Sequence, residues 1–158
     1  MSLYKYFRIS KPAPDRVPGD RVDAEYRRLR SRTFWGASVV YSLYYVCRMT
    51  LSVVKQPLID GGVLSASDLG LIGSALLLVY AFGKFVNGFI ADYCNIRRFM
   101  AAGLFVSAAV NLVMGLLGFF GRAVSVPGIV MMAVFFILWG ANGWVQSMGA
   151  PPGIINLS

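Results

Sequence analysis

The stretch that decides the fold lies at residues 99–121 and reads FMAAGLFVSAAVNLVMGLLGFFG, without a single charged side chain. A helix rises about 1.5 Å per residue, so this run can cross the roughly 30 Å hydrocarbon core of a bilayer. A second uncharged run extends from Ala123 to Ser158. With 57% apolar and only 14% charged residues, the chain lacks the mixed-charge surface of a soluble domain. A lipid bilayer is therefore its expected surrounding.

Two further apolar segments are each interrupted by one cation, Arg48 in the first and Lys84 in the second. Because lipid cannot hydrogen-bond an open backbone, every span must be helical, and the sequence predicts an all-α membrane fold. Ser65 stands three residues before Asp68, a pattern typical of a helix N-cap. The predicted spans are residues 34–54, 69–91, 99–120 and 127–147, within one transmembrane segment at 33–152.

Residues 1–32 form a polar tail that carries nine of the fifteen Lys and Arg residues. Acids precede bases from Asp23 to Arg30, which favours a short interfacial helix leading into the first span. The tail lacks the apolar run of a cleavable signal peptide. With Arg97 and Arg98 in the second loop, its positive charge predicts that both chain ends face the cytoplasm of a bacterial inner membrane. Flanking a membrane also explains the net charge of +8 without a nucleic-acid partner.

The residue types needed for metal or covalent chemistry are scarce. The chain has no histidine and no cluster of carboxylates or thiols at metal-ligand spacing. Cys47 falls inside an apolar segment and Cys94 in a short polar loop, so no disulfide is implied. No nucleophile-base pair is recognisable. We therefore expect no metal, no cofactor and no enzyme activity.

The cation of the first span has aromatic neighbours at helical spacing. Tyr45 lies three residues before Arg48 and Tyr41 seven residues before it, so all three project from one face. A guanidinium costs at least about 2.5 to 3.5 kcal/mol in hydrocarbon, and such a residue normally faces a polar cavity or a partner. None of the four predicted spans contains an acid that could neutralise it. A cation flanked by phenolic donors indicates an anion site.

Lys84 repeats this pattern in the second span. Tyr80 lies four residues before it and Asn87 three after it, which predicts one polar stripe on an apolar helix. Two unpaired cations on adjacent helices repel each other unless water or an anion screens them, and a phosphate dianion suits an arginine fork and a lysine point charge. The alternative is that either side chain snorkels to the membrane surface.

The second predicted loop reads GFIADYCNIRR from Gly88 to Arg98. It resembles the loop signature of the major facilitator superfamily through Gly88, Asp92 and Arg97, which implies a gating role for these three residues. The signature is degraded, because Tyr93, Asn95 and Ile96 replace an arginine, a glycine and a basic residue. Asp92 ends a helix where the dipole disfavours an acid, so we expect a cationic partner such as Arg97 or a group on another span. The alternative is a solvated loop acid.

Four segments taken together resemble the organophosphate:inorganic phosphate antiporter family of the major facilitator superfamily. In that family, the matching positions place Arg48, Tyr41 and Tyr45 at the phosphate site, with Tyr80 and Lys84 nearby. Asn142 and Gln146 are candidates for lining its cavity, or else they bond neighbouring helices. The segments are KPAP (11–14) with YRRLR (26–30), YYVCR (44–48), YAFGKF (80–85) and NGWVQSMGAPP (142–152).

The resemblance implies exchange of a hexose phosphate or glycerol-3-phosphate for inorganic phosphate. Such transporters rock two halves of twelve spans around a midplane site, whereas four spans are predicted here. The likeness ends after Pro152, and we expect residues 153–158 to mark a truncated chain that is inactive alone, with a separately encoded remainder as one partner. A membrane sensor of hexose phosphate, or a residual bundle without a ligand, are the alternatives.

Overall fold

The computed structural model describes residues 6–9, 18–121 and 126–149. The predicted all-α fold is confirmed, since no strand occurs in these ranges and four helices are long and apolar enough to cross a membrane. Each predicted span corresponds to one of these helices. The predicted chain end at 153–158 and the KPAP segment lie outside the described residues. The elements are η1 (Gly19–Arg21), α2 (Val22–Asp60), α3 (Ala66–Asp92), α4 (Ile96–Gly121) and α5 (Gly128–Ser147).

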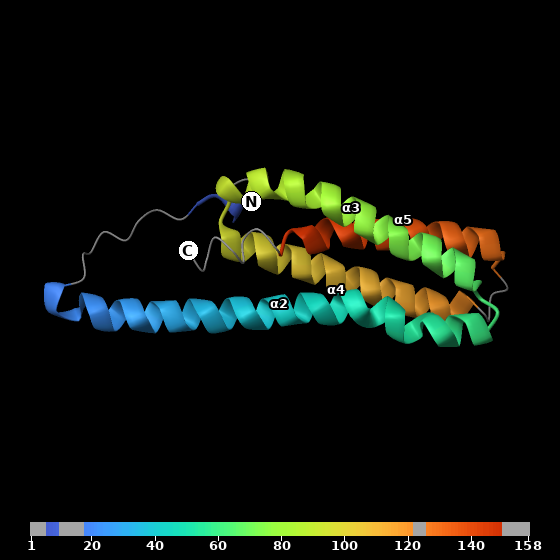
Figure 1. Ribbon diagram of the computed structural model, residues 1–158, viewed down its shortest axis with the longest axis horizontal. Coiled ribbons are helices and arrows are strands. Elements are labelled where there is room, and N and C mark those ends of the chain that lie inside the picture. The colour runs from blue at the N-terminus through green and yellow to red at the C-terminus, as the bar shows by residue number, and fades with distance from the viewer. Residues whose placement is uncertain (1–5, 10–17, 122–125, 150–158) are drawn as a thin grey trace.

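Helix α2 is longer than the span predicted within it. It starts in the tail, where Asp23 and Glu25 in its first turn favour the positive end of the helix dipole. The expected interfacial helix and the first span are therefore one continuous helix, whose N-terminal part projects beyond the other helices in Figure 1. Pro57, predicted to lie in a loop, sits in the last turn, where the loss of one backbone donor does not end the helix. Gly62 then turns the chain with a φ of 65°.

The start of α3 has the predicted cap. The Ser65 side chain accepts a hydrogen bond from the Asp68 amide at 3.1 Å, and the Asp68 carboxylate accepts one from the Ser65 amide at 2.9 Å. This reciprocal capping box satisfies two backbone donors that a helix start leaves free. It fixes where the chain enters the second span.

The four long helices lie alongside one another, as Figure 1 shows. Helices α3 and α5 approach most closely: a β-carbon at Gly143 would lie only 2.5 Å from the Leu76 carbonyl oxygen, and one at Gly83 would lie 2.5 Å from Ser147 Oγ. Glycine at these positions lets the backbones meet. The apolar core that the bundle encloses includes Ile72 and Phe135, which are fully buried.

Helix α2 leaves open space beside its neighbours. A cavity of about 420 Å³ lies between α2, α4 and α5, with Leu58, Gly118 and Phe135 among the residues that line it. On the outer surface, large apolar side chains such as Leu78, Phe85 and Phe105 are exposed. In a membrane-spanning bundle such side chains contact lipid, because hydrocarbon is as apolar as they are.

Candidate functional site

Arg48 is held by side chains from two other helices. Its Nε donates a hydrogen bond of 2.8 Å to Gln146 Oε1 of α5. The guanidinium carbon lies 4.2 Å from the centre of the Tyr80 ring of α3 and 5.6 Å from that of Tyr45. Aromatic faces attract cations at such distances. The arginine predicted as an anion contact therefore stands where α2, α3 and α5 meet.

Lys84 shares the same aromatic ring. Its Nζ lies 5.0 Å from the centre of Tyr80, so two cations flank one tyrosine. Neither Arg48 nor Lys84 forms an ion pair in the described part of the chain. The ion pairs found there, Arg21–Asp20 and Arg28–Glu25, lie in the tail. The site has a positive charge of two with no acid to balance it, as the sequence predicts.

The two tyrosines of the first span occupy the edge of this site. Tyr41 packs edge-on against Tyr45 with ring centres 5.2 Å apart, and both side chains are largely exposed. Tyr45 reaches Arg48, whereas Tyr41 contacts Tyr45. The structure thus brings Tyr45, Arg48, Tyr80 and Lys84 together. Tyr41 lies one turn before Tyr45, nearer the start of α2.

A buried polar network continues from Arg48 into the bundle. Gln146, which accepts from Arg48, donates through Nε2 to Ser107 Oγ at 3.4 Å, and that hydroxyl donates to Asn142 Oδ1 at 2.6 Å. Asn142 and Gln146 are both buried, so they bond neighbouring helices, which is one of the two roles that the sequence leaves open. Asn111 Nδ2 donates to the Ser107 carbonyl at 2.8 Å.

Two atoms of this network have no hydrogen-bond partner among the described residues, Asn111 Oδ1 and Asn142 Nδ2. Sequence reasoning missed Ser107 and Asn111 as members of the site. Their signal is the four-residue spacing of two polar side chains within the uncharged run at 99–121, since residues four apart share a helix face.

Asn87 does not join Lys84 on a common stripe. It is buried, and its Nδ2 donates to Ser147 Oγ at 2.6 Å and to the Trp144 carbonyl at 3.2 Å. Three residues turn a helix by about 300°, so Asn87 points about 60° away from Lys84. That difference in direction places the Asn87 side chain between α3 and α5. Asn87 is a structural link between helices.

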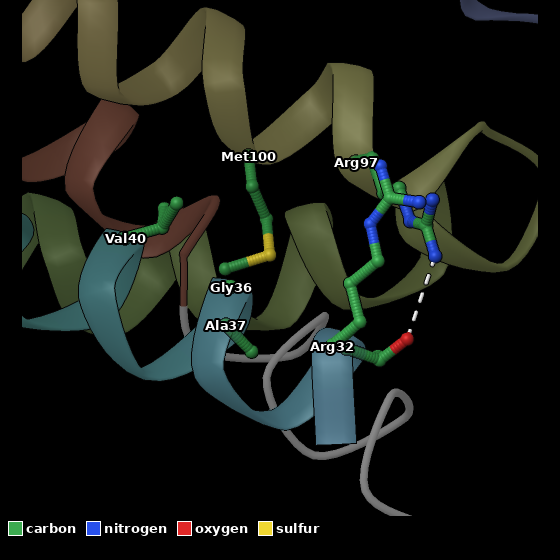
Figure 2. A pocket seen from close by; sticks show the side chains of 7 residues that line it. Arg32, Gly36, Ala37, Val40, Arg97 and Met100 are labelled. Atoms are coloured by element: carbon green, nitrogen blue, oxygen red, sulfur yellow. Dashed lines mark hydrogen bonds between the residues drawn. The ribbon is translucent and has the colours of Figure 1, made fainter. Parts of the chain in front are cut away.

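The predicted pairing of Asp92 with Arg97 is wrong. Arg97 Nη2 instead donates to Thr33 Oγ1 of α2 at 3.4 Å, drawn as the dashed line in Figure 2. Asp92 is exposed at the end of α3 and forms no ion pair within the described ranges, which fits the alternative of a solvated acid. Arg97 already belongs to α4, and its side chain crosses toward α2 rather than back to α3. Gly88 is half-buried one turn before Asp92.

The tail contacts this loop. The Phe7 carbonyl accepts a hydrogen bond of 2.7 Å from the Asn95 amide, and the Tyr6 carbonyl accepts one of 2.5 Å from Arg98 Nη1. The Arg98 guanidinium also lies 4.9 Å from the centre of the Tyr6 ring. Residues near the start of the chain therefore fasten to the connection between α3 and α4.

Comparison with known proteins places these features in context. The chain is 38% identical over 147 residues to a glycerol-3-phosphate transporter of Bacillus subtilis, covering 91% of this chain and 31% of the relative. It is 32% identical over 148 residues to a probable hexose phosphate transport protein of Chlamydia pneumoniae, covering 94% and 30%. The membrane sensor protein UhpC of Salmonella typhimurium is 28% identical over 149 residues, covering 94% and 31%. No family profile and no solved structure matches the chain.

The chain spans about three tenths of the length of these relatives, while the match covers more than nine tenths of the chain itself. Such coverage agrees with a resemblance carried by the tail, by both cation-bearing helices and by α5. The relatives are named as transporters of phosphate esters and as a membrane sensor. This multi-pass membrane protein is therefore a relative, over nearly its whole length, of the organophosphate transporters of the major facilitator superfamily.

Proposed function

We propose that this chain carries the anion-binding part of a secondary transporter that exchanges an organic phosphate, a hexose phosphate or glycerol-3-phosphate, for inorganic phosphate. The observation that supports it most is the pair of cations beside Tyr80, with no acid in the four predicted spans. Their mutual repulsion favours a bound anion over an empty site.

The orientation of Arg48 suits a phosphate. Gln146 accepts the hydrogen bond from Nε, and Tyr80 is a second hydrogen-bonding neighbour of the guanidinium. A guanidinium can bind two phosphate oxygens at once through its remaining donors, whereas Lys84 adds a point charge. Gln146 acts here as a positioning residue, since it fixes the plane in which the fork is presented.

The direction of the Lys84 side chain argues against snorkelling. Lys84 lies eight residues, or about 12 Å, before the end of α3 at Asp92. Its ammonium group leans back over Tyr80, one turn nearer the helix start and away from the end at Asp92. A lysine that reached for the membrane surface would extend toward Asp92 instead.

The site on this chain contains one arginine and one lysine. The resemblance implies a second arginine from the other half of a full transporter, and a phosphate dianion needs nearly complete compensation when it leaves water. We therefore infer that the 158 residues alone insert in the membrane, bind phosphate esters weakly and move none. Organic phosphate, inorganic phosphate and a separately encoded remainder are the proposed partners.

The same proposal includes a topology. The basic tail and Arg97–Arg98 lie on one side of the four spans, which assigns that side to the cytoplasm of a bacterial inner membrane. A reporter enzyme that works only in the periplasm, fused at either chain end, should stay inactive. Activity of either fusion would contradict this orientation.

A phosphate sensor is the second candidate, because the relative in Salmonella typhimurium is named a membrane sensor protein. A sensor keeps the ligand site and dispenses with exchange. Binding of a phosphate ester by a completed protein that shows no phosphate-dependent uptake would favour the sensor over the transporter.

The decisive experiment supplies the part of a relative that this chain does not match. In a chimera, this chain replaces the region that it matches in the Bacillus subtilis transporter, and the purified protein is reconstituted in phosphate-loaded vesicles. We expect saturable uptake of labelled glycerol-3-phosphate that requires internal phosphate. Arg48→Lys should weaken phosphate binding by about 30-fold, because an ammonium cannot replace a bidentate fork.

The control makes the same chemical change at the exposed tail residue Arg30. Arg30→Lys should leave uptake unchanged. Normal phosphate binding by the Arg48→Lys chimera would contradict the assignment of Arg48 as the main anion contact. Saturable exchange by the unmodified 158-residue chain would contradict the inference that it is inactive alone.

A further inference from the structure

A second basic site lies far from Arg48, between residues 32–40 of α2 and the start of α4. A cavity of about 270 Å³ opens there, and Figure 2 shows it from close by. Arg32 of α2 and Arg97 of α4 contribute to its wall. Sixteen residues separate Arg32 from Arg48 on one continuous helix, a distance of about 24 Å, so the two sites are distinct.

The charges of this cavity are not balanced. Arg32 and Arg97 both line the cavity, and Figure 2 draws their side chains at the same end of it. Among the described residues neither one forms an ion pair, and the hydrogen bond from Arg97 to Thr33 is a long one of 3.4 Å between an exposed cation and a neutral hydroxyl. Two guanidinium groups in one cavity form a favourable binding site for the oxygens of a phosphate group.

The floor of the cavity is apolar. It consists of Gly36, Ala37 and Val40 on α2 and of the buried Met100 on α4. A β-carbon at Gly36 would meet nothing within 4 Å, so space remains directly above the backbone of α2. A ligand that fills this cavity must present charge to the arginines and hydrocarbon or glycerol to the floor.

The cavity stands at the level where hydrocarbon gives way to head groups. The apolar run of α4 begins at Phe99, two residues after Arg97, and that of α2 begins at Phe34, two residues after Arg32. Trp35 is 65% exposed and packs edge-on against Phe34 with ring centres 5.8 Å apart. Exposed tryptophan side chains are enriched at the membrane interface.

We propose that this cavity binds the phosphodiester of an anionic phospholipid, with the head group between Arg32 and Arg97 and the glycerol and upper acyl chain over Gly36 and Val40. Basic pockets between transmembrane helices are suited to acidic head groups. A soluble phosphate would bind the two guanidinium groups but would leave the apolar floor of the cavity in contact with water. A phospholipid satisfies both parts of the cavity.

The test uses the fluorescence of Trp35, which adjoins the site. Trp139→Phe and Trp144→Phe leave it as the sole tryptophan of the chain. The chain is reconstituted in phosphatidylcholine vesicles that contain increasing brominated phosphatidylglycerol, or brominated phosphatidylcholine for reference, and quenching gives the relative binding constant. We expect phosphatidylglycerol to bind about tenfold more tightly, since each nearby arginine contributes to attraction of an acidic head group.

Matched variants test whether the lipid preference comes from the cavity itself or from the net positive charge of the tail. Arg32→Gln with Arg97→Gln should remove most of the preference, and Arg27→Gln with Arg30→Gln, which removes equal charge outside the cavity, should keep it. Gly36→Leu should abolish the preference by filling the cavity while both arginines remain. Gly70→Leu, at another exposed helical glycine with open space, should have no effect.

Three results would overturn the proposal. Equal losses from the two arginine pairs would assign the preference to diffuse tail charge. A full preference in the Gly36→Leu chain would exclude the cavity as the seat. Loss of the preference on adding millimolar inorganic phosphate at constant ionic strength would make a soluble anion the ligand instead of the lipid. Circular dichroism of each variant checks that the helices form, and a variant that misfolds is replaced by Gly36→Ile at the same position.

Discussion

The α3–α5 contact and the α2–α4 contact differ in how far they are closed. Between α3 and α5, Gly83 and Gly143 bring the backbones together, and the buried Asn87 bonds across the contact. Between α2 and α4, the buried Tyr44 side chain lies against Gly103, but cavities open near both ends of the contact. Helices in lipid are not driven together by the hydrophobic effect. Two of them therefore pack closely only where small residues allow contact and hydrogen bonds stabilise it.

This difference separates stability from binding. The closed pair α3–α5 supplies a fixed wall, on which Tyr80 and Gln146 are held. Helix α2 provides the cation Arg48, which meets this wall through Gln146 and Tyr80. Substitutions should therefore act mainly on folding at the closed contact and mainly on ligands or on cavity filling at the open one.

The largest effect is expected from Gly143→Val. The new side chain would place its β-carbon 2.5 Å from the Leu76 carbonyl oxygen, and backbone cannot move aside as a flexible side chain can. We expect the free energy of unfolding to fall by about 3 kcal/mol, measured by titration with sodium dodecyl sulfate and circular dichroism. Gly140→Ala is the control, because its β-carbon would lie 3.7 Å from Val79 Cγ2, an ordinary contact. Equal stability of both variants would remove the proposed difference between the two contacts.

The second-largest effect is expected where Arg48 of α2 bonds Gln146 of α5. Gln146→Glu replaces the neutral acceptor of Arg48 with a carboxylate of the same shape. An ion pair would then neutralise Arg48, so the chimeric transporter should bind phosphate about 30-fold more weakly while the bundle remains folded. Gln146→Leu, which removes the acceptor without adding charge, should have a smaller effect. Undiminished phosphate binding by the Glu variant would show that the positive charge of Arg48 is not what attracts the anion.

A stabilising change is expected on the open side. At Gly118 a β-carbon would lie 3.5 Å from Leu58 Cδ2, which is normal van der Waals contact inside the cavity. Gly118→Ala should raise the free energy of unfolding by about 0.5 to 1 kcal/mol, since alanine favours the helix and fills space. The same detergent titration measures it. A loss of stability would mean that α2 and α4 are packed as tightly as α3 and α5.

The smallest effect is expected at the buried polar link that the described residues form between α2 and α4. The Tyr44 hydroxyl donates a hydrogen bond of 2.8 Å to the Met100 carbonyl. Tyr44→Phe should lower the free energy of unfolding by about 0.6 kcal/mol, the typical size of such a bond in a membrane protein. Tyr41→Phe, at an exposed ring of the same helix, is the control and should change nothing. A cost of several kcal/mol at Tyr44 would show that this link alone holds the open side together.

The four spans and the capping box of Ser65 follow from the sequence, because span length and helix starts are local properties. The neighbourhood of Arg48, Tyr45, Tyr80 and Lys84 was also predictable, since each pair on one helix is set by helical spacing. The resemblance to a family added that α2 and α3 share the site. The spacing within each helix does not depend on how the helices rotate against each other, whereas the approach of Arg48 to Tyr80 does.

The remaining features do depend on that rotation. Arg48 and Gln146 are 98 positions apart, and only the packed bundle brings their side chains within 2.8 Å. Helical spacing alone predicted that Asn87 lies beside Lys84. Its side chain points about 60° away from that of Lys84, however, and contacts α5. The pairing of Asp92 with Arg97 failed because a side chain can choose a partner on another helix, here Thr33, that sequence distance does not reveal.

Helix α2 has 39 residues, and a straight helix of that length measures about 58 Å, nearly twice the hydrocarbon thickness. Such a rod works as a lever. A tilt of about 5° pivoting near Pro57 would carry the far end at Val22 through about 5 Å, a movement larger than any at Arg48 itself. A spin label or fluorophore attached near the tip of α2 would therefore magnify small rearrangements of the cation site into displacements that spectroscopy can resolve, without a probe in the site.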